Sequence, residues 1–154
     1  MKDLQRRKRV AEIFAEGCFA KAEDFSAAAM VYQHGIVPEH FFQAFVWAKR
    51  AVELGDKSQK RRMQMAIDRY LVSTGHKQLF GSQAHKADYD PKTCYCLHQI
   101  EPTFTDNERT KDGGRSLERQ YDWLKKLNEG KSCPHVQCQK PLKPTPKGTI
   151  PGYW

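Results

Sequence analysis

The sequence predicts a mainly α protein: a repeat-like helical hairpin, a third helix, a small irregular or β-ribbon insertion and a C-terminal helix. Over most of residues 4–74, apolar residues recur at spacings of three and four, which is the period of a helix. Glycines and prolines interrupt this pattern where helices are expected to end or begin. At 154 residues the chain is long enough to bury one core. We therefore expect a single helical domain over residues 1–130 and an extended, mobile Pro- and Lys-rich tail over 131–154.

The first 74 residues contain the clearest helical signals. Residues 4–25 are expected to hold an N-terminal helix, whose apolar stripe includes Ile13 and Gly17. Residues 26–74 are expected to form the hairpin and the third helix. In the hairpin, an alanine-rich segment starts at Ser26 and ends at Gly35, a C′ glycine, and Pro38 suits the first turn of the next helix. Alanines allow the two helices to approach closely. The third helix is expected over about 58–74.

Residues 44–56 (AFVWAKRAVELGD) resemble the second helix of a tetratricopeptide or Sel-like repeat. Such repeats need about three stacked units to be stable, and the sequence contains one. The resemblance therefore implies a repeat-like hairpin and not a solenoid.

Residues 75–130 are expected to hold an irregular segment and a final helix. Residues 78–83 and 93–98 are candidates for a β-ribbon across Asp88–Pro91. Thr105 and Glu108 have the spacing of a capping box. Ser116 is expected to cap the final helix, over about 117–127.

The formal net charge of +8 raises the possibility of a nucleic-acid partner. Two basic clusters, at residues 6–9 and 57–62, contain no interleaved aromatic residues, which nucleic-acid-binding modules usually add. We therefore favour solvated helix faces over a nucleic-acid or acidic-partner patch. No apolar stretch approaches the roughly 20 residues needed to span a bilayer. The basic N-terminus is not followed by the apolar run of a secretory signal, so we expect a cytoplasmic protein with no membrane partner.

The chain has five cysteines. Cys18 stands alone in a helical pattern, so we expect it to be a small buried residue. The other four are candidates for unpaired thiols, for one or two disulfides or for a zinc site: Cys94, Cys96, Cys133 and Cys138. Unpaired thiols fit a cytosolic protein best. Zinc is the least favoured, because the spacing is not that of two Cys-x-x-Cys knuckles. No other cofactor is expected.

Three polar segments lie where an ordinary core would be apolar: Gln33-His34-Gly35, Asp68-Arg69 and Gln78-x-x-Gly81-x-Gln83. They resemble the signature of an uncharacterised family of small helical proteins, a domain of unknown function. That signature has His-Gly, then Asp-Arg, then Gln-x-[Tyr/Phe]-Gly-[Thr/Ser]-Gln, and the resemblance covers roughly residues 26–128. Phe80 and Ser82 stand where Tyr and Thr are the usual residues. The resemblance implies a shared fold and brings no established activity.

These segments allow two interpretations. In the structural one, Arg69 lies in a buried ion pair and His34 caps a helix C-terminus. In the functional one, the catalytic candidates are His34 as general acid or base, Asp68, and Arg69 as a clamp for an anionic group. The candidate ligand-binding residues are Gln33, Gln78, Gly81 and Gln83. We favour the structural interpretation.

Three functions follow from these features, and the sequence leaves open whether the protein is an enzyme. A scaffold module that binds an unknown protein or peptide is ranked first because of the repeat-like hairpin. A small enzyme with a His/Arg/Gln site, acting on an anionic small molecule or peptide, is second. A nucleic-acid-associated basic protein, based on net charge alone, is third.

Overall fold

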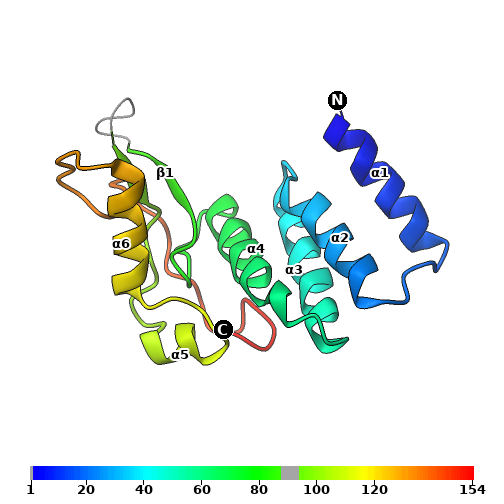
Figure 1. The fold of residues 1–154 in the computed structure, drawn as a ribbon. Helices are drawn as coiled ribbons and strands as arrows, with labels where there is room; N and C mark the ends of the chain where they lie inside the picture. Colours follow the sequence, from blue (N-terminus) through cyan, green and yellow to red (C-terminus); the bar gives the residue numbers. More distant parts are fainter. Residues whose placement is uncertain (1, 88–93) are drawn as a thin grey trace. The chain divides into compact units, whose positions relative to one another are not determined.

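The structure is a computed structural model that describes residues 2–87 and 94–154. The protein is mainly α-helical, as expected, and contains a two-stranded antiparallel sheet (Figure 1). The chain divides into two compact units, residues 1–70 and 71–154, and each is described by itself. Within the described ranges, no helix has the length and apolar character needed to cross a bilayer.

The first helix of unit 1, α1 (Lys2–Ala15), is shorter than the helix predicted over residues 4–25. It ends where Gly17 takes a left-handed conformation with φ +73°. The N–H of Gly17 donates to the Phe14 carbonyl, and that of Cys18 donates to the Ile13 carbonyl. This pair of bonds is a Schellman motif, so Gly17 ends the helix and is not part of its apolar stripe. Cys18 follows it as an exposed free thiol, so its predicted burial is wrong.

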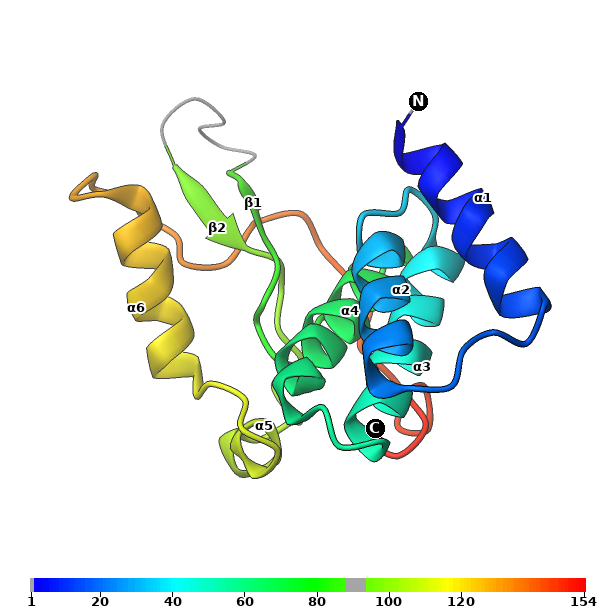
Figure 2. The ribbon, with the colours of Figure 1, turned by 45° about the vertical axis from the view of Figure 1, so that its right-hand side comes forward.

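Helices α2 (Ala22–Gln33) and α3 (Pro38–Glu53) lie side by side and form the centre of unit 1 (Figures 1 and 2). α2 begins before the predicted Ser26, because the Asp24 carboxylate accepts hydrogen bonds from the Ala20 and Lys21 N–H groups and caps the first turn. The buried residues of the two helices are mostly small, and several alanines are fully or almost fully buried: Ala28, Ala29, Ala44, Ala48 and Ala51. α2 and α3 therefore pack through small side chains.

The ring of Trp47 in α3 connects the helices of unit 1. Its centroid lies 4.7 Å from that of Tyr32 in α2 and 5.3 Å from that of Phe14 in α1. Phe19, in the connection between α1 and α2, lies 5.7 Å away. These tilted and edge-to-face contacts are favourable aromatic geometries.

Helix α4 (Lys60–Ser73) is the predicted third helix. A 3₁₀ turn, η1 (Lys57–Gln59), precedes it, and the Asp56 carboxylate caps this turn by accepting from the Ser58 N–H. The boundary between the two units falls inside α4, after Tyr70.

The sheet of unit 2 pairs β1 (Ala84–Lys86) with β2 (Tyr95–Leu97), with His85 opposite Cys96. The second strand lies where the sequence places it, and the first follows the predicted segment 78–83. The predicted crossing at Asp88–Pro91 lies outside the described residues.

The two helices of unit 2 begin at the predicted residues. α5 (Asp106–Lys111) starts with the Thr105–Glu108 capping box, in which Thr105 Oγ1 accepts from the Glu108 N–H. Ser116 caps α6 (Leu117–Asn128).

Residues 131–154, expected to be an extended and mobile tail, instead pack within unit 2. The Lys77 N–H donates to the Lys143 carbonyl, and Thr145 Oγ1 donates to the Lys77 carbonyl. Ile150 is 1% exposed, and the Trp154 indole N–H donates to the Thr145 carbonyl at 2.8 Å. The Pro- and Lys-rich composition is typical of a solvated segment, but Ile150 and Trp154 near its end are buried.

Candidate functional site

In unit 1, the C-terminus of α2 brings together part of the predicted polar cluster. Arg69 Nη1 in α4 donates to the Gln33 carbonyl at 2.6 Å, and Arg7 Nη1 in α1 donates to the His34 carbonyl at 3.2 Å. Two guanidinium groups thus meet the negative end of the α2 dipole. The His34 residue itself is exposed, while Asp68 is fully buried. Burial lowers the pKa of Arg69.

The Gln33 side chain has an unusual environment. It is 5% exposed, and neither its amide nitrogen nor its amide oxygen has a hydrogen-bond partner in the described part of the chain. A buried amide without partners costs about 1–3 kcal/mol. Gln33, the predicted ligand-binding residue of unit 1, therefore has a buried amide without a partner among the described residues.

Gly35 does not have the left-handed conformation expected of a C′ glycine, because its φ is not positive. Instead, a Cβ built on Gly35 would lie 2.2 Å from Cβ of His40 in α3. His40 Nδ1 also accepts a hydrogen bond from the Ile36 N–H at 3.2 Å. Gly35 is required by the close approach of His40 to this turn.

In unit 2, the other predicted ligand-binding residues stabilise an irregular segment. Gln78 is fully buried, and its amide nitrogen donates to the carbonyls of Gln83 and His98 at 3.0 and 2.7 Å. Its amide oxygen accepts from the Gln83 N–H at 2.8 Å. Gly81 has φ +68°, which favours glycine. Both amide hydrogens of Gln78 are thus bound to the backbone.

The predicted residues fall into two groups. Gln33, His34, Asp68 and Arg69 belong to unit 1, and Gln78, Gly81 and Gln83 belong to unit 2.

The four cysteines of unit 2 form two disulfides, Cys94–Cys133 and Cys96–Cys138. The unpaired thiols that the sequence favoured are therefore not found, and the sulfurs needed for a four-cysteine zinc site are bonded to one another. No group of three or more His, Cys, Asp or Glu residues that could hold a metal occurs in the described ranges. Disulfides are typical of proteins in oxidising compartments.

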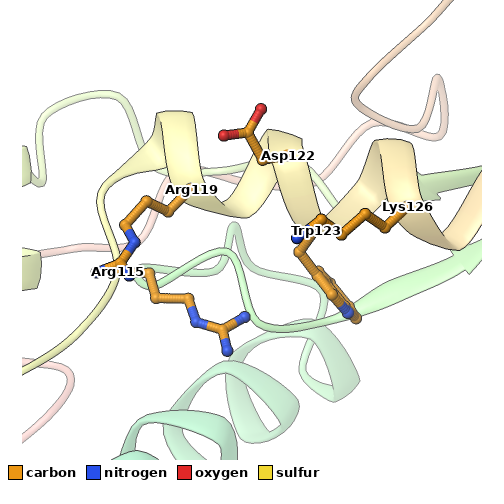
Figure 3. Close-up of a pocket in the computed structure, with 5 residues that line it drawn as sticks. All are labelled: Arg115, Arg119, Asp122, Trp123 and Lys126. Atoms are coloured by element: carbon orange, nitrogen blue, oxygen red, sulfur yellow. The ribbon is translucent and has the colours of Figure 1, made fainter.

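A cavity of about 280 Å³ lies along α6. Its lining residues, here called the basic pocket, are Arg115, Arg119, Asp122, Trp123 and Lys126 (Figure 3). Positions 119, 123 and 126 follow one another at spacings of four and three, so they share a helix face. Trp123 is half-buried, whereas the other two tryptophans of the chain are 4% and 9% exposed.

The cations of the basic pocket have no ion-pair partner among the residues that the structure describes. The side chains of Arg115, Arg119 and Lys126 form no ion pair with any residue that the structure describes. The Asp122 carboxylate lies 3.9 Å from Lys125 Nζ. In Figure 3 it points away from the side to which Arg115 and Trp123 extend. Three cations and an indole face are therefore available to an anionic ligand with an apolar part.

This site was not predicted, because its basic residues do not follow one another in the sequence. The signal is present at helical spacing: two cations flank Trp123 on one face of α6, opposite the face that carries Leu117, Tyr121 and Leu124.

No protein-family profile, curated protein or solved structure matches the chain. The resemblance to an uncharacterised family of small helical proteins therefore stays a prediction, as does the resemblance to a tetratricopeptide or Sel-like repeat.

Proposed function

We propose that this protein is a binding module that holds an acidic segment of a partner protein in the basic pocket. The observation that carries the proposal is the set of three cations, Arg115, Arg119 and Lys126, that have no carboxylate partner in the described ranges. Uncompensated cations around a cavity attract anions over about 10 Å at moderate ionic strength. The net charge of +8 adds to this attraction.

The pocket's composition favours a peptide that combines carboxylates with one apolar or aromatic side chain. Arginine forms two parallel hydrogen bonds to a carboxylate, which gives Arg115 and Arg119 a geometric preference for Asp and Glu. Trp123 offers an amphipathic ring of the kind that dominates binding energy at protein interfaces. The ligand is thus a short segment with acidic residues on both sides of an apolar anchor.

The other two functions receive less support. Single-stranded nucleic acids are usually held by several aromatic platforms along a basic track, and this pocket offers one indole. The two disulfides favour an oxidising compartment, which argues against both a nucleic-acid partner and a cytoplasmic location. For the enzyme, the amide of Gln78 is already bonded to the backbone, and the pocket lining contains neither His nor Cys.

The proposal is tested by measuring the binding of fluorescently labelled peptides to the full chain. The acidic peptide contains alternating Asp and Glu around a central Phe, and the controls are its Lys-substituted counterpart and an oligouridylate. Of these three ligands, we expect only the acidic peptide to bind, and its affinity should fall as the salt concentration is raised. Trp123 supplies an internal signal, because it is the most exposed of the three tryptophans. Bound peptide should therefore reduce the quenching of tryptophan fluorescence by acrylamide.

The decisive variant is Arg115→Glu/Arg119→Glu, for which we expect at least tenfold weaker binding, equivalent to about 1.4 kcal/mol. The matched control is Lys8→Glu/Lys57→Glu, which changes the net charge equally at two exposed residues of unit 1. Equal losses in the two variants would mean that binding reflects net charge and not the pocket. Preferential binding of the oligouridylate would favour the nucleic-acid function instead.

A further inference from the structure

A second cluster in unit 2 combines two imidazoles with a disulfide. A cavity of about 160 Å³ is lined by His85, His98, Cys138 and two lysines, Lys86 and Lys140. The two histidine rings have centroids 5.7 Å apart. Cys138 is bonded to Cys96, and Cys96 lies opposite His85 in the β1–β2 pairing. Two imidazole rings and the two sulfur atoms of a disulfide thus lie close to one another beside the β1–β2 pair.

The hydrogen bond of the His85 ring suits metal binding. Its Nδ1 lies 2.6 Å from the Lys86 carbonyl oxygen. A carbonyl oxygen only accepts, so Nδ1 is the donor in this bond, and in the neutral tautomer that makes it the lone pair is on Nε2. Histidines that bind metals usually donate their other ring N–H to a carbonyl or a carboxylate in this way.

We propose that reduction of the Cys96–Cys138 disulfide converts this cluster into a tetrahedral zinc site, whose ligands are the thiolates of Cys96 and Cys138 and the imidazoles of His85 and His98. A dithiol reductant supplies two electrons and two protons, so that the S–S bond becomes two thiols and the reductant becomes a disulfide. Zinc then binds both sulfurs as thiolates and displaces two protons to the solvent. Two Cys and two His residues are a common ligand set of structural zinc sites.

The charge balance and the oxidised structure agree with this inference. Two thiolates neutralise the charge of Zn²⁺, so Lys86 and Lys140 at the cavity face a neutral centre. In the oxidised protein, the two sulfurs are bonded to each other, and the described ranges contain no group of three or more His, Cys, Asp or Glu residues that could hold a metal. The site therefore exists only after reduction and is independent of the basic pocket.

The competing arrangement is a site made of four cysteines. Cys94, Cys96, Cys133 and Cys138 pack in one cluster, but Cys133 lines a different cavity, which includes His135 and Lys131. A four-cysteine site requires both disulfides to be reduced, whereas the proposed site requires one. The two arrangements differ in whether they need His85 and His98.

The test measures zinc bound to the full, tag-free chain before and after reduction with a dithiol that is then removed without air. We expect about one zinc ion per reduced chain and none per oxidised chain. When cobalt replaces zinc, the absorption spectrum should be that of a tetrahedral site with thiolate ligands. Cys94→Ser/Cys133→Ser should keep the reduced site, and Cys96→Ser/Cys138→Ser should abolish it. The variant His85→Ala/His98→Ala keeps all four cysteines and should bind zinc at least tenfold more weakly.

Two results would overturn the proposal. One is a reduced wild-type chain that binds no zinc. The other is wild-type affinity in His85→Ala/His98→Ala together with loss of zinc in Cys94→Ser/Cys133→Ser, which would establish the four-cysteine site. If a cysteine variant does not fold, as judged by circular dichroism, the histidine variant decides the question, because it keeps all four cysteines and can form both disulfides before reduction.

Discussion

Replacing Gly35 by alanine tests whether the glycine of the Gln33-His34-Gly35 segment serves packing. The new Cβ would lie 2.2 Å from Cβ of His40 and 2.7 Å from its Cγ and Nδ1. The nearest atom is next to the backbone of α3, so a change of rotamer does not relieve the contact. Overpacking of this kind costs about 1–3 kcal/mol. A displaced His40 also loses its hydrogen bond from the Ile36 N–H, worth about 1 kcal/mol.

We therefore expect Gly35→Ala to lower the free energy of unfolding by about 2–4 kcal/mol, measured by urea titration monitored with circular dichroism. The same substitution in a His40→Gly background should cost much less, because the clashing side chain is gone. Where space is available, Gly→Ala usually stabilises a protein by about 0.4–1 kcal/mol. A Gly35→Ala protein as stable as the wild type would thus refute the close contact with His40.

Two further predictions concern the polar residues. Arg69→Ala should lower the free energy of unfolding by about 1.5–3 kcal/mol, because a charged donor to the Gln33 carbonyl is lost. His34 is exposed, so His34→Ala should change the free energy of unfolding by less than about 0.5 kcal/mol. Urea titrations of both variants check this, and equal effects would contradict it. Because burial holds the folded pKa of His98 below the ordinary value of 6.5, the unfolded chain binds this proton more readily. Its contribution to stability should therefore fall as the pH drops from 6.5 towards the folded pKa. Urea titrations across this range should show a smaller pH dependence for His98→Gln, and an unchanged dependence would count against the burial effect.

Much of the helical structure could be predicted because its signals are local. The Thr105–Glu108 capping box and the Ser116 cap depend on residues within one turn, and both occur where the sequence places them. The helix predicted over residues 4–25 is longer than α1. Gly17 fits an apolar stripe by its spacing, but its left-handed conformation ends the helix. The role of a glycine depends on its φ angle and on its neighbours in space, and the spacing of apolar residues predicts neither.

The remaining features depend on contacts between distant residues. The disulfides join cysteines 39 and 42 positions apart, and their state depends on the redox environment as well as on the chain. Thr145 donates a hydrogen bond to the Lys77 carbonyl, and Trp154 donates one to the Thr145 carbonyl. The composition of the C-terminal segment does not predict these contacts. In the candidate site, the amide of Gln78 donates to the carbonyls of residues 83 and 98. No sequence pattern predicts the second bond, because its partner is 20 residues away.

The two disulfides close a covalent ring around α5 and α6, because both join the β2 region to residues 133–138. The Gly113-Gly114 link between these helices lies inside that ring. A protease that cuts this link would produce two fragments still joined by both disulfides. Such a nicked protein would migrate as one chain until a reductant separates it. The helix of the basic pocket would thus remain attached after cleavage, as a two-chain form held together by its sulfur bridges.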